Sequence, residues 1–197
     1  MLNRELQIEF ASIMSHLSGK DYVTSRIAFG AAPTLLGSKP STILTFKHQQ
    51  KNTFTIWNRY KKEICHELGL EFYELIERPE SITVLFYRKD SLENYLKEDK
   101  NQSYLEKLGY KKGFSFDDKL KQLKKRYATT CPHEMGIFLG IPVEDVCGFI
   151  MHQGKNCLLC RYWKVYHDLH NAQKQFESFD CARRLVIRQV IEKYRAA

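Results

Sequence analysis

The side chains most able to do chemistry lie in the central stretch 131–166, which holds four cysteines and two histidines. Cys157 and Cys160 have the C-x-x-C spacing, at which two thiols can share a metal ion or close a disulfide. A tetrahedral metal site needs further ligands, and Cys131 or His133 could supply them. The sequence therefore allows a metal or thiol redox site at these four residues, or else two reduced thiols at the entrance of a strand.

His133 and Glu134 also begin the H-E-x-x-H pattern of zinc metalloproteases. The second histidine of that pattern would stand at position 137, which is Ile137, so a metalloprotease is excluded. His133 can still act as an acid, a base or a ligand, or it can be held by a hydrogen bond at a helix end. No nucleophile, base and orienting group can be placed together, so the sequence leaves open whether the protein is an enzyme.

Anion binding is a second kind of chemistry that the sequence allows. The segment 30–42 is rich in glycine, proline and hydroxyl residues, which is typical of an ordered loop. It does not match a phosphate-binding P-loop, because Ser38 separates Gly37 from Lys39 and a proline follows. A loop that carries Lys39 and Thr34 could still hold an anion, although a plain turn between a helix and a strand explains it equally well.

A lysine between two tyrosines is the third candidate group. The segment 161–166 alternates in polarity as a strand does, so Trp163 would point into the core and Tyr162, Lys164 and Tyr166 would share the opposite face. Such a face could bind a phosphate, a carboxylate or a flat ring. It could equally be an ordinary exposed strand face.

Periodicity predicts the elements that must position these residues. Helices are expected at 3–16, 22–29, 54–68, 91–98, 102–108, 115–127 and 169–194. Another helix is expected to begin after Pro142, with a packing stripe made by Val143, Val146, Cys147 and Ile150. Strands are expected at 43–47, 70–76, 82–88 and 161–166. We therefore predict an α+β fold of one domain over 1–197. Its small, mainly antiparallel sheet would use the hairpin at about 70–88 and the strand at about 161–166, under a cover of helices, with a long C-terminal helix that could protrude.

Charge and composition limit the partners. The net charge is +8, and the second half of the chain carries +7 of it, with 17 basic and 10 acidic residues in 101–197. An anionic partner is therefore plausible, and nucleic acid is one candidate, although the basic residues at 119–126 also fit a solvated helix face. The longest apolar run is far below the roughly 18 residues of a membrane span, and the charged start does not resemble a signal peptide. We expect a cytoplasmic protein with reduced cysteines.

Several blocks of the chain resemble the bacterial family catalogued as domain of unknown function 3793. The blocks are Ala32-Pro33-Thr34-Leu35 with Gly37 and Lys39-Pro40, then Pro132-His133-Glu134, Phe138-Leu139-Gly140, Pro142, Glu144-Asp145-Val146 and Gly148-Phe149-Ile150, and finally Tyr162-Trp163-Lys164-Val165-Tyr166. The resemblance spans nearly the whole chain and implies a single bacterial cytosolic domain without an established activity. That family has a cysteine just ahead of the first block, where this chain has Ala31, so no role for that thiol transfers. The blocks also imply that Lys39, Thr34, His133 and Lys164 converge on one site.

These patterns favour an accessory module that binds an anionic small molecule or an acidic partner protein, such as an electron carrier. The expected ligand-binding residues are Thr34, Lys39, His133, Tyr162, Lys164 and Tyr166. The alternative is a thiol redox or metal protein that uses Cys157 and Cys160 with Cys131 or His133. A second alternative is nucleic-acid binding through the basic C-terminal half.

Overall fold

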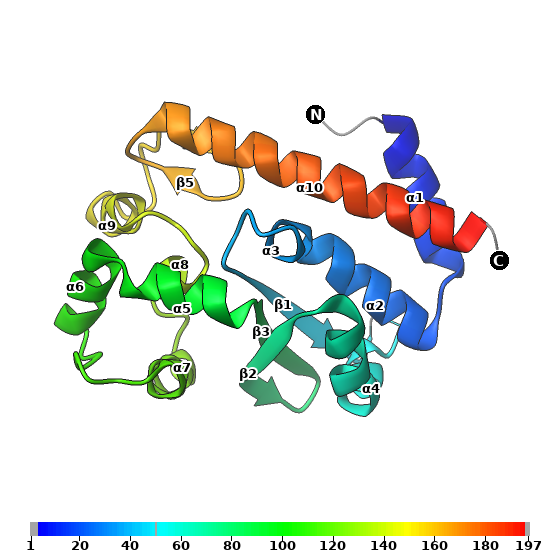
Figure 1. Cartoon of the computed structure of the whole chain (residues 1–197), viewed down its shortest axis with the longest axis horizontal. Coiled ribbons are helices and arrows are strands. Elements are labelled where there is room, and N and C mark those ends of the chain that lie inside the picture. The colour runs from blue at the N-terminus through cyan, green and yellow to red at the C-terminus, as the bar shows by residue number, and fades with distance from the viewer. Residues whose placement is uncertain (1–3, 50, 196–197) are drawn as a thin grey trace.

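The computed structural model, which describes residues 4–49 and 51–195, has an α+β fold (Figure 1). Its helices are α1 (Arg4–His16), α2 (Gly19–Gly30), α3 (Ala32–Leu35), α4 (Thr53–Leu68), α5 (Lys89–Lys97), α6 (Asp99–Lys107), α7 (Phe116–Tyr127), α8 (Met135–Phe138), α9 (Val143–Met151) and α10 (Leu169–Arg195). Its strands are β1 (Ser41–Lys47), β2 (Glu71–Arg78), β3 (Ser81–Tyr87), β4 (Leu159–Cys160) and β5 (Lys164–Val165). The predicted fold class is therefore confirmed. Asn3, the first residue of the predicted first helix, lies outside the described residues.

The main sheet is antiparallel with the strand order β1-β3-β2. β3 is the central strand, as its apolar residues on both faces predict, and six of its seven residues are buried. One face packs against α2 and α4 through Val84 and Phe86, and the opposite face packs against α5, α7 and α8 through Leu85 and Tyr87. Figure 1 shows the sheet between these two groups of helices. The two apolar layers hold the sheet in place from both sides.

β4 and β5 form a separate two-stranded hairpin, and here the structure differs from the sequence prediction. Only Lys164–Val165 of the predicted strand 161–166 is extended, and it pairs back onto Leu159–Cys160. The residues between them form a tight turn, in which the amide of Arg161 donates to the carbonyl of Trp163 at 3.2 Å. The alternation that suggested one strand belongs to a turn followed by a short strand, so the expected shared face of Tyr162 and Lys164 does not form.

Asp145, in the first turn of α9, holds this hairpin. It is 2% exposed and accepts three hydrogen bonds, from Trp163 Nε1 at 2.7 Å and from the amides of Tyr166 at 2.7 Å and His167 at 2.8 Å. Gly148, one turn later, lets β5 approach closely, because a Cβ there would lie 2.5 Å from the Cβ of Tyr166. The start of α9 therefore fixes the position of the hairpin and of the chain that leads into α10.

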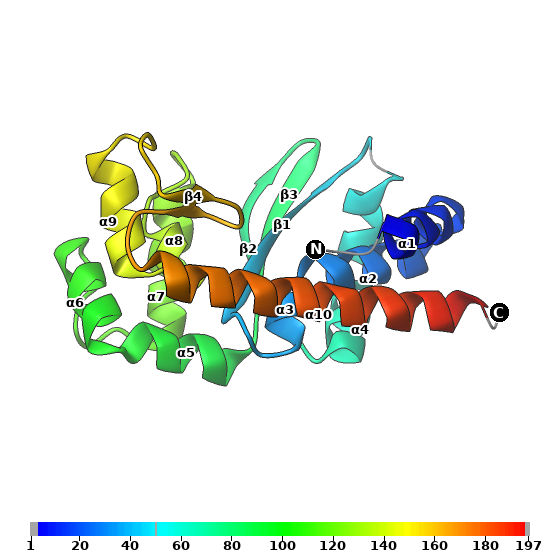
Figure 2. The same ribbon diagram turned by 90° about the horizontal axis from the view of Figure 1, so that it is seen from above.

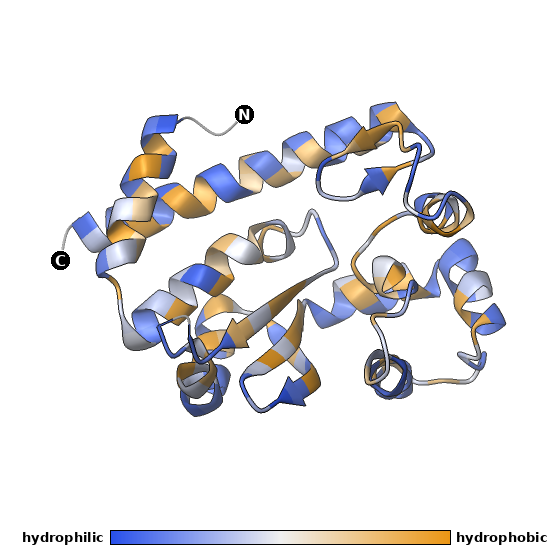
Figure 3. Ribbon diagram, turned by 180° about the vertical axis from the view of Figure 1, so that it is seen from behind, coloured by the Kyte–Doolittle hydropathy of each residue, from blue (hydrophilic) through white to orange (hydrophobic). Residues whose placement is uncertain are grey.

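The C-terminal helix α10 runs across the molecule beside α1, α3 and the β4–β5 hairpin (Figure 2). Apolar and polar residues alternate along it as stripes (Figure 3). The predicted packing stripe is confirmed, since its members Ala172, Phe176, Phe179, Ala182, Val186 and Val190 are all buried. None of the helices in the described residues is long and apolar enough to cross a membrane.

Candidate functional site

Contacts divide the predicted ligand-binding residues into two groups, and Tyr166 lies apart from both beside His152. The first group lies where the loop after α3 and the turn of the hairpin meet the middle of α10. It contains Lys39, Tyr162 and Arg183, a residue that the sequence analysis did not single out. The second group surrounds Phe149 on α9 and contains His133 and Lys164. Each group is described in turn.

The loop that carries Lys39 is held by its own hydrogen bonds. The amides of Ser38 and Lys39 both donate to the carbonyl of Pro33, at 2.9 and 3.1 Å. Thr34 is fully buried beneath the loop, and its hydroxyl is 2.8 Å from that of Thr42. These groups therefore stabilise the loop from within, and the side chain of Lys39 is the part of it left to meet a ligand.

Lys39 lies in an electrostatically unfavourable place. Its ammonium makes no hydrogen bond or ion pair with any residue that the structure describes. Burial and the nearby positive charge of Arg183 lower the pKa of Lys39 from 10.5 to about 8. A nearby carboxylate would act in the opposite direction. The lysine is thus held partly buried next to another cation, and neither has an ion-pair partner among residues 4–49 and 51–195.

Arg183 is held by aromatic rings rather than by an acid. The Cζ atom of its guanidinium lies 4.9 Å from the ring centre of Tyr162 and 5.3 Å from that of Phe29. Its Nε is buried and has no hydrogen-bond partner among the described residues. Asp180, one turn earlier on α10, is already occupied, because it accepts from the hydroxyl of Tyr162 at 2.7 Å and from Arg161 at 2.8 Å. We call Lys39 and Arg183 the cation pair.

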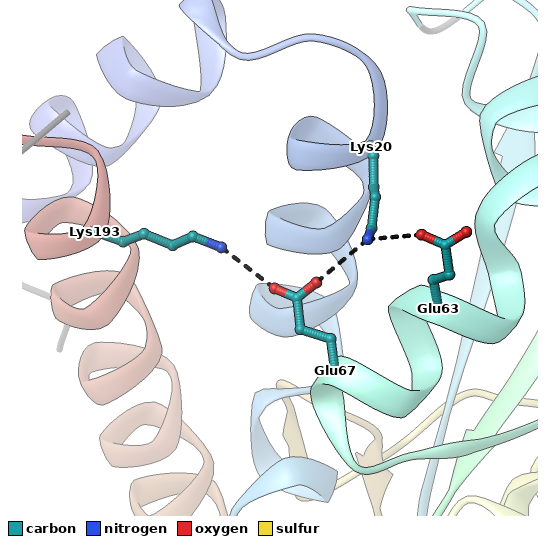
Figure 4. A network of polar contacts seen from close by, with 4 residues as sticks. All are labelled: Lys20, Glu63, Glu67 and Lys193. Carbon is teal, nitrogen blue, oxygen red and sulfur yellow. Dashed lines mark hydrogen bonds and ion pairs between the residues drawn. The ribbon is translucent and has the colours of Figure 1, made fainter.

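Other cations on the same helix do find acids. Lys193 of α10 lies 3.3 Å from Glu67 of α4, which also lies 3.9 Å from Lys20 of α2 (Figure 4). Lys20 in turn donates to Glu63 at 3.1 Å. This network is half exposed and worth little to stability, but each of its charges has a partner. Arg184 and Arg188 of α10 also have no ion pair among the described residues, so the feature that sets the cation pair apart is the burial of Lys39 beside a second positive charge.

An open depression lies beside Lys39, and Arg183 does not line it. Its volume is about 490 Å³, and it runs between the loop 37–40 and α5, where Ser91, Asn94 and Glu98 line it together with Lys39. The carboxylate of Glu98 accepts a hydrogen bond from Asn101 at 3.3 Å and is not an ion-pair partner of Lys39. The depression gives a small molecule room next to the lysine.

The second group is centred on the exposed ring of Phe149. The ring of His133 lies 5.8 Å from it, and the ammonium of Lys164 lies 5.8 Å from its centre on the hairpin side. Lys164 also donates to the carbonyl of Gly154 at 2.6 Å, which fixes its position. His133 additionally lines a pocket of about 370 Å³ together with Ile150 and Cys131.

Glu134 forms the inner wall of that pocket. It is 1% exposed, and both Arg126 of α7 and the hydroxyl of Tyr110 donate to it. Burial and the negative charge of Glu134 raise the pKa of Tyr110, so the phenol remains protonated. A buried carboxylate with two donors is a structural tie between α7 and α8.

The predicted thiol and metal residues do not form one cluster. Cys131 and His133 line the pocket, whereas Cys157 and Cys160 lie at the hairpin. Among the described residues, no three His, Cys, Asp or Glu side chains are grouped so that they could hold a metal ion. All six cysteines are free thiols, and Cys160 is exposed.

Tyr166, the last predicted ligand residue, lies beside the C-x-x-C pair. Its ring stacks on that of His152 at 5.5 Å with an angle of 6° between the planes. Burial and the neighbouring thiols of Cys157 and Cys160 raise the pKa of Tyr166. Its hydroxyl is buried and has no hydrogen-bond partner in the described part of the chain. Tyr166 therefore belongs with His152 and the thiols, whereas Tyr162 belongs with Arg183.

Comparison with known proteins gives one match. A model of the family described as "Protein of unknown function (DUF3793)" matches residues 27–197. No curated protein and no solved structure matches the chain. The matched range includes both members of the cation pair and all of α9.

Proposed function

The chain belongs to the DUF3793 family of proteins of unknown function, and because membership supplies no activity, we propose from its own side chains that it binds an anionic small molecule at the cation pair. The observation that carries this proposal is the pairing of Lys39 with Arg183, neither of which has an ion-pair partner among the described residues. Two like charges in a partly buried place repel each other and lose hydration. An oxyanion between them would remove both costs.

A phosphate group is the ligand chemistry that fits best. The forked guanidinium of Arg183 can donate two parallel hydrogen bonds to phosphate oxygens, and the ammonium of Lys39 adds a point charge. Two positive charges match the two negative charges of a phosphate near neutral pH. The depression beside Lys39, lined by Ser91, Asn94 and the carboxylate of Glu98, provides room for the rest of a phosphorylated molecule, whose phosphate would lie at the lysine end.

Replacing Lys39 with glutamine tests this proposal. We expect Lys39→Gln to weaken the binding of inorganic phosphate by about 10- to 100-fold in calorimetric titrations, since a charge-assisted contact contributes about 1.5–3 kcal/mol. Lys121→Gln is the matched control, because it removes the same charge from an exposed position on α7. Equal affinities of the two variants would contradict the proposal.

The same two variants separate the nucleic-acid alternative. Binding of a DNA duplex through general positive charge would fall steeply with salt and would respond to Lys121→Gln as much as to Lys39→Gln. Binding at the cation pair would respond to Lys39→Gln alone.

The Arg183→Lys variant is expected to bind phosphate with an affinity between those of the wild type and Lys39→Gln. It keeps the positive charge and removes the forked guanidinium that can donate two parallel hydrogen bonds.

A further inference from the structure

The end of α9 exposes three consecutive large apolar residues. Phe149 is 39% exposed, Ile150 is 42% exposed and Met151 is 76% exposed. Ile150 was expected in the packing stripe of this helix, yet it faces the pocket beside His133 instead. Phe149 and Ile150 both adjoin His133, and Met151 follows them as the last residue of α9. Single exposed apolar residues are common, but three at one helix end mark a surface that another molecule can cover.

Positive charge lies beside this apolar group, because the ammonium of Lys164 lies 5.8 Å from the ring centre of Phe149. The segment 146–167 contains no Asp or Glu, while it contains Lys155, Arg161 and Lys164. Before this segment, Glu134 is paired with Arg126, Glu144 with Lys100, and Asp145 with the hairpin. After it, the exposed Asp168 accepts a hydrogen bond from the amide of Asn171. Arg161 is paired with Asp180, so Lys155 and Lys164 are the cations of this segment that have no acid partner among the described residues.

We propose that the α9 surface, formed by His133, Phe149, Ile150, Met151 and Lys164, binds an acidic amphipathic segment of a partner protein. The apolar side of the segment covers the exposed group on α9, and its carboxylates face Lys164 and Lys155. Complementary charge of this kind speeds association and selects the partner. This site is separate from the cation pair, so the inference does not depend on the proposed function.

The pocket beside Ile150 gives the partner an anchor. Its volume is about 370 Å³, and Tyr104, Leu108 and Pro132 line it together with Ile150 and His133. One apolar side chain could lie there against these residues, with the ion pair of Arg126 and Glu134 at the inner wall. Such central anchors supply most of the affinity of an interface. A flat lipid surface would leave the pocket unused.

A second copy of this chain is a poorer occupant. The chain has a net charge of +8, and a symmetric contact would bring the cations of two α9 surfaces together with no acid between them. A short amphipathic helix of a partner binds an apolar surface through residues spaced three and four apart. Such a helix could reach both the end of α9 and the neighbouring pocket.

Selection from a displayed library of random peptides of about 16 residues tests the inference. Peptides that bind the Met151→Glu variant are first removed from the library, and the remaining peptides are then selected for binding to the wild-type protein. Met151 is exposed, so its replacement by glutamate is compatible with the fold. We expect enriched peptides to have a net negative charge and apolar residues at a spacing of three or four. Synthesised singly, they should bind Met151→Glu about tenfold or more weakly and Lys164→Gln several-fold more weakly.

Two controls complete the test. Leu185→Glu introduces the same charge at another exposed apolar residue, on α10, and should leave peptide affinity unchanged. Lys39→Gln should also leave it unchanged, which keeps this result distinct from that of the cation pair. Enriched peptides without excess acid, or with equal affinity for Met151→Glu, would overturn the inference. The inference would also be overturned if no acidic peptide were selected while Met151→Glu abolished one of two other interactions. These are dimerisation of the protein, measured by sedimentation, and binding of the protein to phosphatidylserine vesicles.

Discussion

Replacing Asp145 with alanine is expected to lower the free energy of unfolding by about 3–5 kcal/mol, because it leaves one buried and two part-buried donors without their acceptor. These donors are the indole of Trp163 and the amides of Tyr166 and His167. Each belongs to the hairpin or to the chain that enters α10, so their loss loosens the hairpin from α9. Denaturant unfolding of the variant and the wild type measures the difference.

Asp168→Ala is the matched control for this prediction. Asp168 is exposed, and its carboxylate accepts one hydrogen bond, from the amide of Asn171 at 3.1 Å at the start of α10. Loss of such a cap typically costs about 1 kcal/mol. If the two alanine variants were equally stable, Asp145 would not be the anchor of the hairpin.

Replacing Lys39 with methionine is expected to stabilise the protein by about 1–3 kcal/mol near pH 7. The pKa of Lys39 is lowered to about 8 in the folded chain, whereas it is near 10.5 in the unfolded chain. The unfolded state therefore binds more protons between these values, and the charged lysine disfavours folding. This penalty is fully present below a pH of about 8 and disappears as the pH rises to about 10.5.

The pH dependence distinguishes this effect from better packing. The stability advantage of Lys39→Met over the wild type should shrink from about pH 8 and vanish above about pH 10.5, and other titrating groups cancel in the comparison. Thermal unfolding of both proteins across this range measures it. An advantage that does not change with pH would indicate that apolar burial, and not the removal of a charge, is responsible. A residue that costs stability in this way is typical of a binding site.

The main fold could be predicted from the sequence because its signals are local. The apolar residues of β3 alternate over both faces, and the stripe on α10 repeats at helical spacing, so burial follows directly from each pattern. The hairpin at 159–165 could not be predicted in this way. Its turn is held by Asp145, which lies 18 residues before Trp163 and so outside any local pattern. The alternation of Trp163 and Val165 fits one continuous strand as well as it fits a turn followed by a short strand.

The candidate site was predictable in part. The composition of its loop identified Lys39, and the face with two tyrosines identified Tyr162. Arg183 was not identified, because its neighbours on α10 are also basic and only packing shows that it lacks an acid. The exposure of Phe149 and Met151 was also hidden, since helical periodicity does not show which face lacks a neighbour.

The most direct test of anion binding at the cation pair is the pKa of Lys39 itself, measured by NMR of its side-chain carbon and nitrogen from about pH 6 to about pH 11. The Lys39→Gln spectrum assigns the signal. We expect a pKa of about 8 without phosphate and a clearly higher pKa in saturating phosphate, because the bound anion favours the charged ammonium. The same pKa with and without phosphate would contradict anion binding at Lys39 and Arg183.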